Sequence, residues 1–71
     1  MFTINLETIK SGIRVTARHR GTTQVYRDGK VGSENDLIAA VMADACGAHR
    51  KADGSFDMTH IQLNDAAKAA A

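Results

Sequence analysis

Apolar and polar residues alternate along the first third of the chain. Every second residue is apolar over residues 2–7, and the same alternation returns over residues 13–20 after a polar stretch at 10–12. A period of two is typical of a strand that buries one face and leaves the other in solvent. The pattern therefore predicts two antiparallel strands whose apolar sides share one core.

A glycine then sets the expected alignment of the second strand with a third. Gly21-Thr22 suits a two-residue hairpin loop, because its first position needs a positive φ that glycine adopts freely. The register that follows from this turn pairs Arg20 with Thr23, Arg18 with Val25 and Ala17 with Tyr26. In that register Tyr26 lies on the core face. The outward face then gathers four arginines: Arg14, Arg18, Arg20 and Arg27.

The middle of the chain predicts a helix over residues 33–47. Ser33 is a suitable N-cap with Asp36 three residues later, a variant of the capping box, and Gly47 suits the helix end. The apolar residues recur at helical spacing: Leu37, Ile38, Val41, Met42 and Ala45. Just before this helix, Asp28-Gly29 predicts a second tight turn that leads into "KVG".

The last third allows two interpretations. The apolar residues of "SFDMTHIQL" keep a period of two at Phe56 and Met58, then change phase before Ile61 and Leu63. A bulged strand explains the change, and so does a helix that starts at Asp57. We favour the strand, followed by a short alanine-rich helix or tail.

These elements predict one small α+β domain over residues 1–71. The expected architecture is an antiparallel sheet of three to four strands, with one helix packed on one face and a short C-terminal helix or tail. A chain of 71 residues hides only about 60% of the surface that its unfolded form exposes. Self-association into a homodimer is therefore an alternative source of burial.

Charge is distributed unevenly along the chain, although the formal net charge is only +1. Residues 10–30 carry six basic side chains and one acidic one, whereas residues 31–71 carry three basic and six acidic. The basic segment coincides with the predicted hairpin. The expected contact residues are Arg14, Arg18, Arg20, Arg27 and Lys30.

A face rich in arginine has three interpretations. Guanidinium groups match phosphate oxygens, so the partner could be a nucleic acid, although the aromatic residues on which single strands stack are missing here. Arginine is also enriched at protein interfaces, where its long stem covers apolar surface. The third alternative is a face that contacts only solvent.

Catalytic, metal and cofactor signatures are weak throughout the sequence. Cys46, His49, Asp57 and His60 have ligand chemistry at loosely zinc-like spacing, but a lone cysteine is more often a small buried apolar residue. We therefore expect no enzymatic activity, no cofactor and no metal.

The compartment is also inferred from weak signals. One cysteine permits no internal disulfide, which fits a reducing compartment. No apolar run approaches the ~18 residues of a membrane helix, and the N-terminal stretch does not resemble a signal peptide. The expected location is the cytoplasm, with no membrane contact.

The stretch "TTQVYRDGKVGSENDLIAAVMA" resembles in style the tiny proteins that phages encode, including anti-CRISPR inhibitors and some virion assembly factors. The resemblance implies a protein that binds another macromolecule. We therefore expect a non-enzymatic binding protein, encoded by a phage or mobile element, that inhibits or modulates a host macromolecular complex such as a CRISPR effector by occluding a site with its basic sheet face. The alternative is a small nucleic-acid-binding protein that uses the same arginine face.

Overall fold

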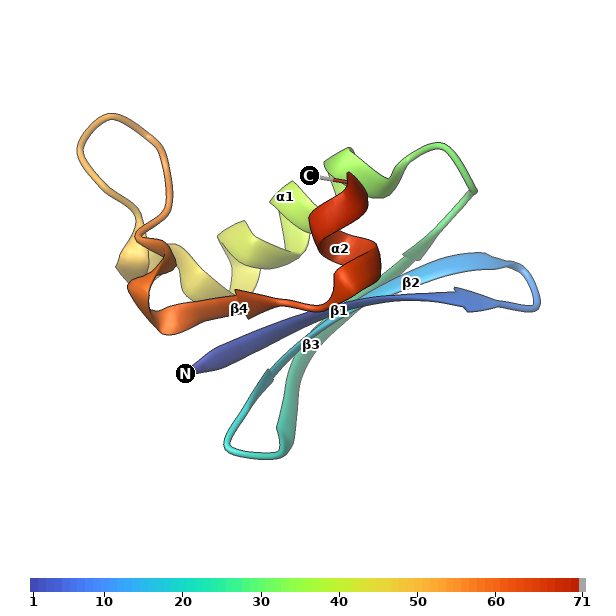
Figure 1. The fold of residues 1–71 in the computed structure, drawn as a ribbon, viewed down its shortest axis with the longest axis horizontal. Helices are drawn as coiled ribbons and strands as arrows, with labels where there is room; N and C mark the ends of the chain where they lie inside the picture. The colour runs from blue at the N-terminus through green and yellow to red at the C-terminus, as the bar shows by residue number, and fades with distance from the viewer. Residues whose placement is uncertain (71) are drawn as a thin grey trace.

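The computed structural model describes residues 1–70, with the backbone alone at Thr23. One sheet carries two helices on the same face (Figure 1). In chain order the elements are β1 (Phe2–Ile9), β2 (Gly12–His19), β3 (Thr22–Gly29), α1 (Glu34–Cys46), η1 (Gly47–His49), η2 (Met58–His60), β4 (Ile61–Leu63) and α2 (Asp65–Ala70), where η1 and η2 are single turns of 3-10 helix.

The strand order in the sheet is β3-β2-β1-β4. The first three strands form an antiparallel meander, and β4 pairs parallel to β1. The predicted α+β class is confirmed, but the sheet is mixed and not purely antiparallel. The chain leaves β3 at one edge and crosses the sheet through α1. The chain therefore returns to the end of the sheet at which β1 begins. From there β4 runs parallel to β1 and β3.

The core lies between the helices and one face of the sheet. Alternate residues of β1 and β2 point into it, as their period of two predicts. They meet the apolar stripe of α1, to which β4 and α2 each add one buried residue. The buried apolar residues are Ile4, Leu6, Ile13, Val15, Ala17, Ile38, Val41, Met42, Cys46, Ile61 and Ala67.

The turn between β2 and β3 lies one residue earlier than the sequence predicted. Its two central residues are Arg20 and Gly21, both with positive φ (54° and 78°), which is the requirement of a type I′ hairpin turn. The ladder therefore pairs Arg18 with Thr23, and its register shifts by one residue between Arg18 and Ala17. Farther along the hairpin the pairs are Ala17 with Val25, Thr16 with Tyr26, Val15 with Arg27 and Arg14 with Asp28. The predicted register was wrong.

The second predicted turn also lies elsewhere. β3 continues through Gly29, which pairs with Ile13, and the chain reverses only after Lys30, where the Ser33 amide bonds the Lys30 carbonyl at 3.1 Å. At Gly12 (φ 146°) an added Cβ would overlap the Gly29 carbonyl oxygen. The end of β3 at Gly29 therefore lies too close to the start of β2 to leave room for a side chain at Gly12.

The helix α1 begins directly after Ser33, as predicted, but the expected capping box is not formed. The Ser33 hydroxyl donates to the Lys30 carbonyl at 2.6 Å and makes no cap bond to the helix. Gly47 follows the last helical residue, as expected, and the chain continues from it into a 3-10 turn.

The C-terminal third contains both a strand and a helix, as the favoured interpretation held. The strand is shorter than predicted, because only residues 61–63 pair with β1. The change of phase between Met58 and Ile61 comes from the 3-10 turn η2 and not from a bulge. Residue 71 of the predicted tail lies outside the described residues.

Asn64 joins this C-terminal third to the meander. Its backbone amide donates to the Ile4 carbonyl at 2.9 Å, so the pairing with β1 extends one residue past β4. Its side chain then accepts from the Leu6 amide and donates to the Leu6 carbonyl, both at 3.1 Å. The same side-chain oxygen accepts from the Ala67 amide at 2.9 Å, which is the bond of a helix N-cap.

Candidate binding surface

The face of the sheet opposite the helices is the candidate site, and we call it the open face. Strand pairing and the alternation of side chains place one set of residues on it. This set is Thr3, Asn5, Glu7 and Ile9 of β1, Arg14, Thr16 and Arg18 of β2, Tyr26 and Asp28 of β3, and Gln62 of β4. Neither helix covers these residues (Figure 1).

Arg14 makes specific contacts at the end of the open face near the β1–β2 turn. Its Nε and Nη2 donate to the two carboxylate oxygens of Asp28 at 2.7 and 3.0 Å, the bidentate geometry that matches a guanidinium to a carboxylate. Its Cζ lies 4.8 Å from the centroid of the Tyr26 ring. Glu7 is its cross-strand neighbour on β1. The guanidinium is thus held in place by Asp28 and Tyr26, with the Glu7 carboxylate on the neighbouring strand.

The same contacts shift the protonation of both partners. The hydrogen bond from Arg14 lowers the pKa of Asp28, and the bond to Asp28 raises the pKa of Arg14. The carboxylate and the guanidinium each favour the charged state of the other. At neutral pH the pair is therefore ionised and contributes no net charge to the open face.

Tyr26 lies on the open face, contrary to the prediction that it would be in the core. It is opposite Thr16, and 57% of its surface is exposed. The one-residue change of register explains the error, since such a shift moves a side chain to the other face of the sheet. The open face consequently carries an aromatic ring beside an arginine.

Arg27 lies on the helix side of the sheet, for the same reason. It pairs with the core residue Val15, and its Nε and Nη2 donate to Asp44 Oδ2 of α1 at 2.9 and 2.7 Å. The prediction that Arg27 shares a face with Arg14 and Arg18 was wrong. Its role in the structure is an ion pair between β3 and α1.

The other predicted contact residues are distributed along the sheet. Arg18 is exposed on the open face near the β2–β3 turn, opposite Thr3, whereas Arg20 lies within that turn. Lys30 follows the opposite end of β3. The five residues therefore do not form one patch, and two of them share the open face.

The open face is electrically balanced. Its two arginines, Arg14 and Arg18, are matched by Glu7 and Asp28. A strongly basic face needed Arg27 and Arg20 beside them, but Arg20 lies within the turn, and the register shift between Ala17 and Arg18 places Arg27 on the other face. The Arg20-Gly21 pair could have revealed the position of Arg20, because glycine also suits the second position of a type I′ turn. The register shift that moves Arg27 does not follow from this turn.

Cys46 is a core residue in the structure. It is 1% exposed, and burial raises the pKa of its thiol. A thiol that resists ionisation is a poor nucleophile and a poor metal ligand. Within residues 1–70, no group of three or more His, Cys, Asp or Glu side chains is placed to hold a metal ion.

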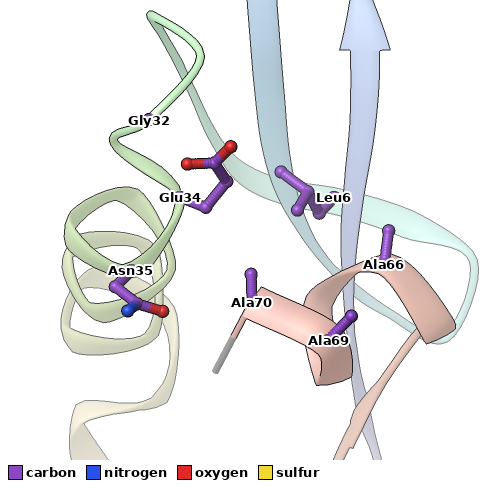
Figure 2. A pocket seen from close by; sticks show the side chains of 7 residues that line it. All are labelled: Leu6, Gly32, Glu34, Asn35, Ala66, Ala69 and Ala70. Atoms are coloured by element: carbon purple, nitrogen blue, oxygen red, sulfur yellow. The ribbon is translucent and has the colours of Figure 1, made fainter.

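A groove lies between the two helices and β1, away from the open face (Figure 2). Its volume is about 450 Å³. Among the described residues that line it, only Glu34 has an ionisable side chain; these residues are Leu6, Gly32, Glu34, Asn35, Ala66, Ala69 and Ala70. This lining offers one carboxylate and no partner for acid–base or nucleophilic chemistry.

No helix within the described part of the chain is long and apolar enough to cross a membrane.

Comparison with known proteins does not assign this chain to a family. No protein-family model, curated protein or solved structure matches the chain significantly.

Proposed function

We propose that this protein is a non-enzymatic binding module that occludes a site on a host macromolecular complex with the open face of its sheet. One observation carries the proposal: Tyr26 is well exposed on the antiparallel part of the sheet, with the Arg14 guanidinium over its ring. Tyrosine and arginine are the residue types over-represented among the side chains that dominate binding energy at protein interfaces.

The electrostatics of the open face favour a protein partner over a nucleic acid. Non-specific binding to nucleic acid needs several cations that neutralise phosphates. Here Arg14 is already paired with Asp28, and Glu7 adds a second negative charge. A mixed polar surface with one aromatic residue resembles the rim and centre of a protein interface more closely.

Preformed geometry also supports binding. Arg14 is held by Asp28 and Tyr26 before any partner arrives, so little side-chain entropy is lost on association. Arg18 lies beside this unit on the same strand and is exposed. The proposed contact residues are therefore Arg14, Arg18 and Tyr26.

The kind of partner is inferred from the resemblance to small phage-encoded inhibitors. It favours a bacterial complex that handles nucleic acid, such as a CRISPR effector, and a mechanism of steric occlusion. The protein would then inhibit by binding alone, without catalysing a reaction. Inhibition would increase with the fraction of target molecules that it occupies.

A pull-down from bacterial lysate with tagged variants tests this proposal. We expect Arg18→Glu combined with Tyr26→Ala to abolish capture of the partner, because both changes remove contacts from the open face without entering the core. Arg27→Ala and Lys30→Ala are matched controls that lie off this face, and they should leave capture within about twofold of the native chain.

The same experiment separates the alternatives. Nuclease treatment of the lysate should leave capture intact, and its loss would favour direct nucleic-acid binding. Equal capture by the open-face variant and the native chain would refute the proposed surface.

A further inference from the structure

A row of four rings lies at the end of the sheet where β1 begins. The Phe2 ring lies between two histidines, with its centroid 4.9 Å from that of His19 and 6.0 Å from that of His49. The His60 ring continues the row, with its centroid 5.1 Å from that of His49 and the planes inclined by 35°. Phe2, His19 and His49 are half-buried, whereas His60 is exposed. The row therefore presents to solvent one flat ring, His60, that a second ring supports.

Arg50 presents a second flat group in the same segment of the chain. Its Cζ lies 4.6 Å from the centroid of the Phe56 ring, and the two residues form a backbone bridge. Arg50 is exposed, whereas Phe56 is half-buried. The Asp57 amide donates to the His49 carbonyl at 2.7 Å, which connects this unit to the row of rings. A guanidinium supported by a ring thus lies beside a ring supported by a ring.

Positive charge prevails at this end of the molecule. The carboxylates of Asp53 and Asp57 also lie in this segment, but each accepts hydrogen bonds within its own turn. The two salt bridges between described residues involve other cations. Four exposed cations lie at this end, two at the end of β2 and two after η1: Arg18, Arg20, Arg50 and Lys51.

We propose that this end of the molecule is a second binding surface, for single-stranded nucleic acid. The bases of a single strand stack on aromatic side chains and on guanidinium planes, while cations contact its phosphates. His60 and Arg50 supply the two stacking groups. Lys51 follows Arg50, and Arg20 lies beyond His19 at the other end of the row, so a strand that follows the row meets a cation at each end. We call these four residues the ring end.

The chemistry of the ring end favours a single strand over a duplex. A duplex hides the faces of its bases in its own stack, so it gains only the phosphate contacts. A single strand gains both kinds of contact. Stacking does not require the imidazole to carry a charge, and both stacking groups are already supported by a ring before a strand arrives.

The ring end is separate from the open face. Phe2 and His19 belong to the set of β1 and β2 residues that alternate toward the helices, whereas Tyr26 lies on the opposite side of the sheet. The segment that carries His60 and Arg50 lies beside α1 and β4 at the end where β1 begins (Figure 1). A strand can therefore bind here whether or not the open face contacts a protein.

Fluorescence anisotropy with a labelled mixed-sequence single strand and a labelled duplex of equal length, at about 50 mM salt, tests the ring end. The single strand should bind more tightly. Its affinity should fall with salt, with a log–log slope of roughly −0.7 for each phosphate contacted. No change in anisotropy with the single strand would overturn the proposal, and so would equal or tighter binding of the duplex.

Matched variants locate the contact. His60→Ala removes an exposed ring and should weaken binding of the single strand by about fivefold or more. Arg50→Glu combined with Lys51→Glu should weaken it by at least about tenfold. Lys10→Glu combined with Lys30→Glu makes the same change of charge at the opposite end of the sheet and should stay within about twofold, since charges farther apart than about 10 Å are screened.

The two kinds of variant keep the test decisive. Thermal unfolding checks that each variant is folded, and the charge pair remains informative if His60→Ala is not. Equal losses in the two charge-reversal pairs would overturn the ring end, because binding would then follow net charge alone. Native affinity in a folded His60→Ala would also overturn it. Tyr26→Ala should bind the single strand as the native chain does, and a loss there would place the contact on the open face.

Discussion

The first 46 residues and the next 24 are stabilised by different means. The meander and α1 contribute nine of the eleven buried apolar residues, whereas the region 47–70 contributes Ile61 and Ala67. That second region is joined to the first by the three pairs of β4 with β1, by the hydrogen bonds of Asn64 and by the ring contact between Phe2 and His49. Burial therefore dominates one region, and specific polar and aromatic contacts dominate the other.

This difference shows how a short chain completes its sheet. The core that α1 forms with β1 and β2 receives only Ile61 and Ala67 from residues 47–70, and β4 adds only three pairs at the edge. Asn64 then satisfies both backbone groups of Leu6 beyond the end of β4. Side-chain hydrogen bonds thus replace strand pairs that the short β4 cannot supply.

The largest expected effect is in the core of the first region. Ile4→Ala removes a fully buried side chain and should lower the free energy of unfolding by about 2–5 kcal/mol. The matched change in the second region, Phe56→Ala, affects a partly buried ring and should cost much less. Urea denaturation measures both, and equal losses would contradict the comparison.

A smaller effect is expected where the regions join. Asn64→Ala removes three side-chain hydrogen bonds, among them the N-cap bond of α2, and should destabilise the protein by about 1–3 kcal/mol. Asn64→Asp keeps the acceptor for the Leu6 and Ala67 amides but places a carboxylate oxygen against the Leu6 carbonyl, so it should also destabilise the protein. If both variants unfold at the native urea midpoint, Asn64 does not hold the two regions together.

The ion pair within the first region should contribute less still. Arg27 and Asp44 are about half exposed, so a double-mutant cycle with Arg27→Ala and Asp44→Ala should give a coupling of at most about 1 kcal/mol. The coupling should shrink in 1 M salt, because screening weakens exposed pairs. A coupling that is larger and independent of salt would mean that the pair is more buried than the structure shows.

The smallest expected effect is the loss of stabilisation from the Arg14–Asp28 pair on the open face at acid pH. Because Arg14 lowers the pKa of Asp28, the stabilisation from this pair is complete above the ordinary carboxyl range near pH 3.9 and is lost as the pH falls through the lower native value. NMR titration of the Asp28 carboxyl should therefore give a midpoint below 3.9 in the native chain and a higher one in Arg14→Gln. Identical midpoints would show that the pair does not form in solution.

Much of the first region could be predicted from the sequence, because its signals are periodic. The alternation in residues 2–7 and 13–20 gave β1 and β2, and helical spacing gave α1 with Ser33 at its start. The class and the core face of these elements followed from those periods. Periodicity carries this information because it repeats over many residues.

The site was harder to predict, because it depends on single residues. Placing the turn at Arg20-Gly21 instead of Gly21-Thr22, together with a shift that leaves Gln24 outside the ladder, exchanges the faces of Tyr26 and Arg27. The preference against a positive φ at arginine favoured the wrong turn. The contacts of the second region, such as those of Asn64, arise from tertiary structure and leave no periodic trace in the sequence.

The register of the β2–β3 hairpin is the claim on which the composition of the open face depends, and interstrand NOEs measure it most directly. The observed register predicts cross-strand contacts between Thr16 and Tyr26 and between Arg14 and Asp28, with Arg27 opposite Val15. Contacts between Ala17 and Tyr26 and between Arg18 and Val25 would contradict it, since they would return Tyr26 to the core face and Arg27 to the open face.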